Sequence, residues 1–271
     1  MHLGVIGFGN IGQELFMLLS DLELVRLTVL VRPGRIETAV EKLESLSQTV
    51  AARTTFVDDI GAFLAAQPSF VVETAGHDAV LNYGADILKS GTDLVVVSIG
   101  ALADAALHDT LVAAARKGKA RMILPSGAVG GLDILAGLAP AGDMQLRYFG
   151  TKPPKAWVGT PVAQNVDLDT LDHVLEFFHG TAREAASAYP KNANVAAALA
   201  LAGGGFDATQ VTLIADPAAT GNSHRYELIS PLATVSVDIA NKASGGNVKT
   251  SLATVYSVLR EIRNRLGPIA I

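Results

Sequence analysis

The hydrophobic pattern at the start of the chain predicts a strand, a tight turn and a helix. An apolar run at 3–6 leads into the glycine-rich segment 7–12, and Leu15, Leu18 and Leu19 then recur at helical spacing. A strand that passes through a short turn into an amphipathic helix is typical of the first unit of a parallel α/β sheet.

Further apolar runs alternate with amphipathic segments as far as residue 125. Buried strands are expected at Leu24–Val31, Phe70–Glu73, Asp93–Val97 and Ala120–Leu124, and helices at Ile36–Leu46, Ala79–Lys89 and Asp104–Lys117. This alternation predicts an α/β fold with a Rossmann-type, doubly wound parallel sheet.

The pattern changes after Pro125. Runs of period two at Thr209–Ile214, Arg225–Ser230 and Ala233–Ile239 predict half-buried strands, and the short turns between them favour antiparallel pairing. We therefore expect a second α+β domain with a mixed, largely antiparallel sheet.

The predicted domains are a dinucleotide-binding domain at 1–125 and a substrate, catalytic and dimerisation domain at 126–246. A C-terminal helix at 247–271 carries Leu252, Val255 and Leu259 on one apolar stripe. We expect this helix to pack back on the first domain, and a dimer-forming helix is nearly as well supported.

Composition narrows the class of protein. The 271 residues are 49% hydrophobic, the formal net charge is -5, and Lys and Arg are scattered, so no nucleic-acid partner is expected. There is no cysteine, which excludes disulfides and cysteine-ligated metal, and no metal site is expected. No apolar run reaches the length of a membrane span and no export leader is visible, so we expect a cytoplasmic protein without membrane contact.

The glycine-rich turn supplies the first candidate chemistry. In a Gly-x-Gly-x-x-Gly turn, Gly7 reverses the chain, Gly9 admits a pyrophosphate to the backbone, and Gly12 lets the helix approach the strand. The helix N-terminus then faces the phosphates. The cofactor contacts expected in the first domain are Gly7, Gly9, Asn10, Ile11, Gly12, Arg32, Ala75 and Gly76.

The end of the second strand bears on the choice between NAD and NADP. An NAD-selective site places an acidic residue about 20 residues beyond the glycines, where this chain has Arg32 and then Arg35. The arginines could pair with a 2'-phosphate, so NAD or NADP is expected as cofactor with tolerance of NADP. The alternative is that both arginines only end a strand in solvent.

Histidine provides the candidate for proton transfer. His224 lies in a turn of small polar residues at a strand start, and imidazole exchanges protons near neutral pH. His77 follows a strand at the carboxyl edge of the first sheet, where it is expected to be a polar loop residue, with a nicotinamide contact as the alternative. Asn192 or Asn194, near the start of an alanine-rich helix, is expected to present a free side-chain amide to a ligand.

Five motifs beyond the glycine turn resemble the L-aspartate dehydrogenase family. They are Pro-Ser-Gly-Ala-Val-Gly-Gly-Leu-Asp at 125–133, Lys-Pro-Pro-x-Ala-Trp at 152–157, Tyr-Pro-Lys-Asn-Ala-Asn-Val-Ala-Ala-Ala-Leu-Ala at 189–200, Gly-Asn-Ser-His at 221–224 and Lys-Thr-Ser-Leu-Ala-Thr at 249–254. The resemblance implies reversible, NAD(P)-dependent oxidative deamination of L-aspartate to iminoaspartate, which yields oxaloacetate and ammonia or feeds NAD biosynthesis.

The resemblance also implies roles for single residues. By motif position Ala128 and Asn194 correspond to cofactor contacts and His224 to the catalytic residue. A dicarboxylate substrate needs cations and N–H donors, for which Lys152, Lys191, Asn222 and Ser223 are candidates, although each could equally be a solvated surface group. A homodimer is expected from the family.

Two alternatives remain open on the sequence. Another two-domain reductase, of the homoserine dehydrogenase or dihydrodipicolinate reductase type, would share the nucleotide domain. A dinucleotide-sensing protein without turnover would have no evident need for the polar His, Asn and Ser residues of the second domain.

Overall fold

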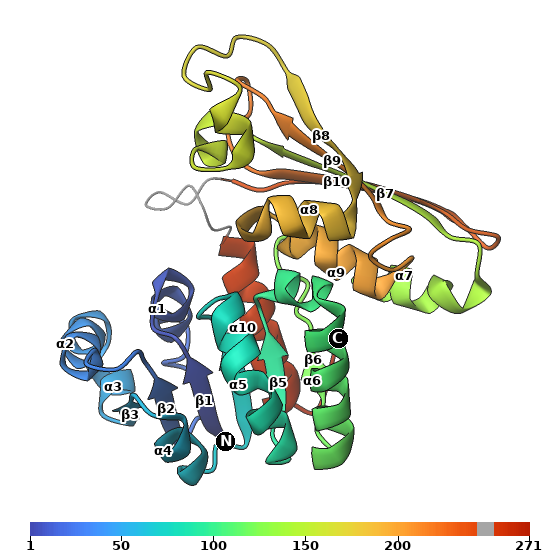
Figure 1. Ribbon diagram of the computed structural model, residues 1–271. Helices are drawn as coiled ribbons and strands as arrows, with labels where there is room; N and C mark the ends of the chain where they lie inside the picture. Colours follow the sequence, from blue (N-terminus) through green and yellow to red (C-terminus); the bar gives the residue numbers. More distant parts are fainter. Residues whose placement is uncertain (243–251) are drawn as a thin grey trace. The chain divides into compact units, whose positions relative to one another are not determined.

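The protein, seen here in a computed structural model that describes residues 1–242 and 252–271, divides into two compact units. One unit comprises Met1–Pro125 and Thr254–Ile271, and the other comprises Ser126–Ala253. Each unit has its own sheet (Figure 1). No helix within the described residues combines the length and the apolar character needed to cross a membrane.

The first unit is built on a six-stranded sheet in the order β3-β2-β1-β4-β5-β6, in which every neighbouring pair is parallel. This confirms the predicted Rossmann-type half. Its strands are β1 (His2–Ile6), β2 (Arg26–Leu30), β3 (Thr54–Val57), β4 (Phe70–Glu73), β5 (Asp93–Val96) and β6 (Met122–Ile123). Its helices are α1 (Asn10–Met17), α2 (Ile36–Leu46), α3 (Gln48–Ala51), α4 (Ile60–Ala65), α5 (His77–Lys89), α6 (Ala105–Gly118) and most of α10 (Leu252–Leu266), with a 3-10 helix at Ile99–Ala103.

Helices cover both faces of this sheet because its strands are apolar on both sides. Leu3 and Val5 of β1 belong to the core that contains residues of α1, α2 and α10. Gly4, which points to the opposite face, lies against Phe63 of α4, where an added Cβ would come within 2.7 Å of the ring. Sheet order reverses between β1 and β4, which is where doubly wound folds bind ligands.

The C-terminal helix completes the first unit. Val255, Val258, Leu259 and Ile262 are buried in the same hydrophobic core as β1 and β4. The chain thus returns to its N-terminal unit after building the second one. The expected beginning of this helix at 247 lies outside the described residues.

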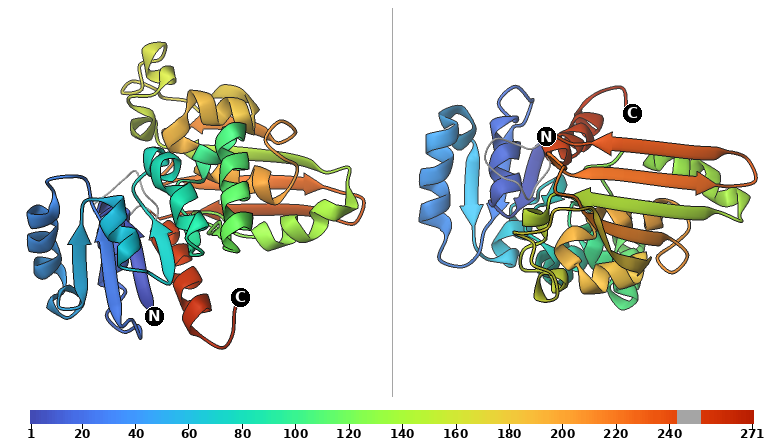
Figure 2. Two further views of the ribbon diagram at one scale, coloured as in Figure 1. Left: turned by 60° about the horizontal axis from the view of Figure 1, so that its bottom comes forward. Right: turned by 90° about the horizontal axis from the view of Figure 1, so that it is seen from above.

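The second unit has a five-stranded sheet in the order β11-β10-β7-β9-β8 (Figures 1 and 2). Its strands are β7 (Gln145–Lys152), β8 (Leu175–Thr181), β9 (Gln210–Ala215), β10 (Ser223–Ile229) and β11 (Thr234–Ala240). Its helices are α7 (Leu132–Leu138), α8 (Ala182–Ala188) and α9 (Asn194–Ala202), with 3-10 helices at Ala139–Ala141, Pro154–Trp157, Pro161–Gln164 and Pro190–Asn192.

This sheet is mixed and largely antiparallel, as predicted. The strands β9 and β10 run in opposite directions, as expected, but they are not neighbours, because β7 lies between them. The strand β9 pairs parallel with β7 and antiparallel with β8. The reason is that β8, α8 and α9 lie between β7 and β9 in the chain and carry it back to the same end of the sheet. Neither β8 nor β3 was anticipated from the sequence.

Candidate active site

The glycine turn after β1 has the geometry that a dinucleotide site needs. Gly7 has φ +94° and lies against Ala75, so the chain reverses there in a conformation that favours glycine. A Cβ on Gly12 would come within 2.7 Å of the Gly7 carbonyl oxygen, so α1 lies close to the turn. A Cβ on Gly9 would meet no atom within 4 Å, which leaves the backbone at the start of α1 open to a ligand.

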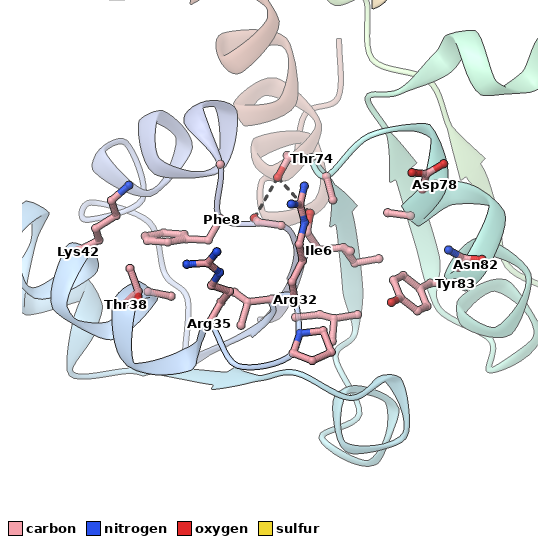
Figure 3. A pocket seen from close by; sticks show the side chains of 18 residues that line it. Ile6, Phe8, Arg32, Arg35, Thr38, Lys42, Thr74, Asp78, Asn82 and Tyr83 are labelled. Carbon is pink, nitrogen blue, oxygen red and sulfur yellow. Dashed lines mark hydrogen bonds between the residues drawn. The ribbon is translucent and has the colours of Figure 1, made fainter. Parts of the chain in front are cut away.

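A cavity of about 640 Å³ opens beside this turn, wholly within the first unit. It has the size of a small-molecule site. Figure 3 shows Phe8, Arg35, Thr38 and Lys42 on one side, with Asp78, Asn82 and Tyr83 on the other. Of the predicted cofactor contacts, the pocket is lined by Gly7, Gly9, Arg32 and Ala75.

The remaining predicted contacts of this unit lie close to the pocket without lining it. Asn10 and Ile11 are the first residues of α1. Gly76 precedes α5 with φ +112°, and His77 is the first residue of that helix. The predicted contacts thus cluster at the glycine turn and at two further loops beside the cavity, and they include both residues that line it and residues that lie next to its lining.

Three cations line the side of the pocket where β2 ends. Arg32, Arg35 and Lys42 make no ion pair with a carboxylate in the described part of the chain. The neighbouring carboxylate of Asp58 accepts a hydrogen bond from the backbone N–H of Gly34, at 3.1 Å. The end of β2 carries positive side chains and not the carboxylate that would accept a hydrogen bond from a ribose hydroxyl. This part of the pocket therefore suits a phosphate group.

A buried carboxylate that the sequence reasoning missed ties two loops of the sheet edge together. Glu73, the last residue of β4, is fully buried and accepts hydrogen bonds from the backbone N–H groups of Ala75 and Gly76, each at 2.7 Å. It also accepts from the backbone N–H and the hydroxyl of Ser98, each at 3.0 Å. Burial raises the pKa of Glu73. An acidic residue closing an apolar strand was the available signal.

The catalytic candidate of the second unit lies on an inner strand of its sheet. His224 is the second residue of β10, only 4% exposed, and lies directly opposite Gly150 of β7. Its Nδ1 is 2.8 Å from the hydroxyl oxygen of Tyr148. Burial, with a smaller contribution from the charge of Lys152, lowers the pKa of His224 to about 4, so the ring is neutral at pH 7.

Gly150 makes the contact between Tyr148 and His224 possible. Gly150 is directly opposite His224, and Tyr148 is two residues before Gly150 on β7, so the three residues share one face of the sheet, called the inner face here. An added Cβ on Gly150 would come within 2.7 Å of the Tyr148 hydroxyl oxygen. The tyrosine ring therefore crosses the space that a side chain at 150 would occupy, which no sequence pattern had indicated.

Lys152 continues this row on the inner face of β7. Its Nζ donates to Oδ1 of Asn192 at 2.5 Å and lies 5.1 Å from the centroid of the Trp157 ring. No carboxylate pairs with it among the described residues, and Asp216, next to its partner strand, instead accepts from the backbone N–H of Ala218. Burial lowers the pKa of Lys152 to about 8.

The other predicted residues of the second unit have different surroundings. Asn192 is not free, because Lys152 binds its amide oxygen. The Ala128 carbonyl accepts from the Asn241 side chain at 3.1 Å, and Asn194 begins α9.

The candidates in the turn before His224 are held partly by backbone pairing. Asn222 accepts a backbone hydrogen bond from Asn241, and the Ser223 hydroxyl lies 3.5 Å from Asp238. Because neighbours alternate along a strand, the side chain of Ser223 points to the opposite face from His224. The side chain of Lys191 lies outside the part of the chain that the structure describes.

Two family models together match nearly the whole chain. The model described as "Homoserine dehydrogenase, NAD binding domain" matches residues 7–125, and the one described as "Aspartate dehydrogenase, C-terminal" matches residues 133–265. The nucleotide half is thus shared with other dehydrogenases, and the half that holds His224 and Lys152 matches the aspartate dehydrogenase model.

Whole-length relatives point the same way. The chain is 41% identical over 272 residues to an L-aspartate dehydrogenase of Ralstonia nicotianae and 39% identical over 273 residues to one of Pseudomonas aeruginosa, with 100% of both proteins covered in each case. Its fold is similar to the crystal structure of aspartate dehydrogenase from Thermotoga maritima, with a TM-score of 0.77, 28% identity and coverage of 100% and 99% of the two chains. A hyperthermophilic archaeal homoserine dehydrogenase, with a TM-score of 0.56 and 13% identity, shares the fold alone.

Proposed function

The chain belongs to the L-aspartate dehydrogenase family, and from that membership we propose that it oxidises L-aspartate with NAD(P)⁺ to iminoaspartate, which water converts to oxaloacetate and ammonia. The observation that carries the proposal is the row of buried Tyr148, buried His224 and half-buried Lys152 in the half that matches the aspartate dehydrogenase model. A half-buried lysine that pairs with no carboxylate among the described residues is not needed to stabilise the fold. Its presence beside His224 therefore favours a functional role.

The first unit is the proposed site of the dinucleotide. The cavity beside Gly7 and Gly9, the open start of α1 and the cations at the end of β2 fit a phosphate-bearing cofactor. When bound, NAD(P)⁺ supplies the acceptor for the hydride that leaves Cα of the substrate. Gly7, Gly9, Asn10, Ile11, Gly12, Arg32, Ala75 and Gly76 are the proposed contacts or supports here, and Ala128 and Asn194 remain proposed contacts on their family motifs.

We propose that this site accepts NADP as well as NAD. Arg32 and Arg35 line the pocket at the end of β2, where an NAD-selective enzyme carries a carboxylate. Lys42 adds a third cation on the same side (Figure 3). Guanidinium groups bind phosphate oxygens with paired hydrogen bonds, so a 2'-phosphate gains attraction here instead of repulsion.

The second unit is the proposed site of the substrate, with His224 as the catalytic residue. Lys152 can attract a carboxylate of aspartate, since it has an uncompensated charge when protonated and only a neutral amide as hydrogen-bond acceptor. Lys191, Asn222 and Ser223 are retained as substrate-binding candidates from the family motifs. Ser223 is the weakest of them, because its hydroxyl lies near Asp238.

A direct test follows NAD(P)H absorbance with purified protein. L-Aspartate with NAD⁺ or NADP⁺ should produce NAD(P)H, and oxaloacetate with ammonia should consume it. Glutamate, alanine and homoserine serve as controls. Turnover of homoserine without turnover of aspartate would favour the homoserine dehydrogenase alternative, and NADH binding without any turnover would favour a sensor.

We further propose that the enzyme is a homodimer working in the cytoplasm, and that its iminoaspartate can feed NAD biosynthesis. The full-length match to metabolic L-aspartate dehydrogenases supports these points. Sedimentation equilibrium of the purified protein measures the oligomeric state, and a monomer at micromolar concentration would contradict the dimer.

A further inference from the structure

The row of inner-face residues on β7 and β10 suggests how the work of catalysis is divided. We propose that Lys152 accepts the proton of the substrate's ammonium group, and that Tyr148 holds His224 beside it as a neutral hydrogen-bond donor. This inference rests on the proposed oxidation of an amino acid. It assigns Lys152 and His224 as catalytic residues and Tyr148 as a positioning residue.

The hydrogen on the His224 ring is set by Tyr148. The Tyr148 side chain is fully buried, and burial raises the pKa of its hydroxyl, which therefore keeps its proton. Among the described residues that hydroxyl has one hydrogen-bond partner, Nδ1 of His224, at 2.8 Å. A buried donor without an acceptor is costly, so the hydroxyl donates to Nδ1.

The hydrogen of the neutral His224 ring then lies on Nε2. With Nδ1 occupied by the tyrosine hydroxyl, Nε2–H is the group that the ring presents to a ligand. His224 is a poor proton acceptor in this state, because a proton on Nδ1 would displace the donated hydrogen bond and the resulting charge would be buried near Lys152. Its chemistry is instead the donation of a hydrogen bond to a substrate oxygen.

Lys152 is the neighbouring group suited to take a proton. It lies two residues beyond Gly150 on the same face of β7, and Gly150 is directly opposite His224, so Tyr148 and Lys152 flank the histidine. Among the described residues, no carboxylate forms an ion pair with its amine. His224 on β10 lies near it, the Trp157 ring packs against it, and its hydrogen-bond acceptor is the neutral amide oxygen of Asn192. Without a carboxylate partner, the amine loses its proton more easily than an exposed lysine does.

The proposed step balances in protons and charge. The neutral Lys152 amine takes one proton from the substrate's –NH₃⁺ group, which leaves a neutral –NH₂ and a lysine ammonium. The lone pair on the substrate nitrogen can then form the C=N bond as the hydride leaves Cα for the nicotinamide, so that two electrons pass to NAD(P)⁺. The new lysine ammonium is compensated by a substrate carboxylate, which explains why the site provides no carboxylate of its own.

The first experiment measures kcat/KM for L-aspartate against pH in the wild type and in Lys152→Arg. The wild type should lose activity as the pH falls through about 8. The arginine variant keeps a cation but has no accessible neutral form, so we expect kcat/KM to fall by about 10²- to 10⁴-fold. The substrate's own titration is common to both proteins, so only the enzyme group differs.

Chemical rescue separates a proton acceptor from a structural lysine. In Lys152→Ala, added methylamine should restore turnover in proportion to the concentration of its neutral form. As a matched control, His224→Gln retains a side-chain N–H. Its kcat/KM should be lower than that of the wild type at every pH, but should fall with decreasing pH at the same position, about pH 8. A Lys152→Arg variant with the same pH dependence and near-normal turnover would overturn the assignment.

The role of Tyr148 is tested by ¹⁵N spectroscopy of the histidine rings in wild type and Tyr148→Phe. In the wild type Nδ1 of His224 should be the unprotonated nitrogen and Nε2 the protonated one. Removal of the hydroxyl should raise the pKa of His224, because the neutral ring loses its donor, and should lower kcat by about 2- to 10-fold with KM for the cofactor unchanged. Protonated Nδ1 in the neutral wild-type ring would overturn this part.

A titration that needs no turnover keeps this inference apart from the proposed function. With ¹³C-labelled lysine, the amine of Lys152 should titrate near pH 8, well below an exposed lysine. An ordinary titration near 10.5 would overturn the inference even in an active aspartate dehydrogenase. A protein that turns over no L-aspartate would refute the proposed function and, with it, the step assigned to Lys152, whatever its amine titrates at.

Discussion

The importance of a single residue in this protein depends on what its neighbours leave it free to do. His224 is buried, neutral and held at Nδ1, so only Nε2 is available to a ligand. Arg32 lines the pocket of the first unit without a carboxylate partner among the described residues. Glu73 precedes Thr74 and Ala75, which line that pocket, and accepts four hydrogen bonds. Each of the three supports a test by substitution.

His224→Ala should lower kcat by about 10²- to 10⁴-fold, because it removes the Nε2–H group that donates a hydrogen bond to the substrate. Cofactor affinity should change little, since NAD(P) is assigned to the first unit. Steady-state kinetics with fluorescence titration of NADH check both parts. Near-normal turnover would remove His224 from the mechanism.

Arg32→Asp should shift the preference from NADP toward NAD. A carboxylate at the end of β2 repels a 2'-phosphate and accepts hydrogen bonds from a ribose 2'-hydroxyl. The ratio of kcat/KM for the two cofactors should change by about tenfold or more. Glu41→Asp, on the outer part of α2, is a matched control, and an unchanged ratio in Arg32→Asp would show that the arginine only ends a strand.

Glu73→Ala should destabilise the protein by about 1–3 kcal/mol and weaken dinucleotide binding, because the N–H groups of Ala75, Gly76 and Ser98 lose their acceptor. Glu73→Gln keeps one acceptor oxygen and should lose less stability and less dinucleotide affinity than Glu73→Ala. Urea unfolding and NADH titration give the two values. Equal losses in both variants would argue against the hydrogen-bond explanation.

At the scale of elements, close approach decides the geometry of both candidate sites. The helix α1 reaches β1 because Gly12 has no Cβ, and the Tyr148 ring reaches His224 because Gly150 has none. The two glycines serve different purposes, since one brings a helix to a phosphate site and the other opens space across a strand for a hydrogen bond.

Gly12→Ala should push α1 away from the turn, because its Cβ would come within 2.7 Å of a backbone oxygen that cannot easily move. We expect a loss of about 1–3 kcal/mol in stability together with weaker NAD(P) binding. Gly9→Ala is the matched control, since its Cβ meets nothing within 4 Å. The Gly9→Ala variant should fold normally and lose only affinity for the cofactor. Thermal unfolding without NADH measures the loss of stability, and the rise in unfolding temperature on adding NADH measures the loss of affinity.

At the scale of the whole molecule, the chain uses both of its ends to build one unit. Residues 1–125 supply the parallel sheet, and α10 returns from the second unit to bury Val258 and Ile262 in the first core. The free energy of unfolding of the protein therefore includes contributions from both units. A titratable group buried in either unit makes that free energy depend on pH.

Lys152 should make stability depend on pH. Its folded-state pKa of about 8 lies below the value of 10.5 for the unfolded chain, so between these values the unfolded chain binds more protons and stability rises with pH. Relative to Lys152→Met, the wild type should gain up to about 3 kcal/mol as the pH rises from about 8 to 10.5, and should lose that gain across the same window as the pH falls back to the folded-state pKa. Urea unfolding of both proteins measures this difference. Lys155→Met, at an exposed position, should behave like the wild type.

The sequence by itself determined the first sheet, the nucleotide turn, the family and the identity of His224 as the catalytic candidate. These depend on local information. Hydrophobic period, glycine spacing within six residues and short motifs are properties of neighbouring positions, and so are the cations that follow β2. The same local information correctly predicted a mixed second sheet with α10 as an amphipathic helix.

Only the tertiary structure decided which distant residues meet. Tyr148 and His224 are 76 positions apart, and Lys152 and Asn192 are 40 apart. Their contacts depend on β10 lying beside β7, on β9 running parallel to β7, and on Gly150 leaving room between them. Strand order and direction follow from packing of the whole sheet, which period and spacing do not encode. Glu73 was missed for the same reason, because its partner Ser98 is brought to it by the pairing of β4 with β5.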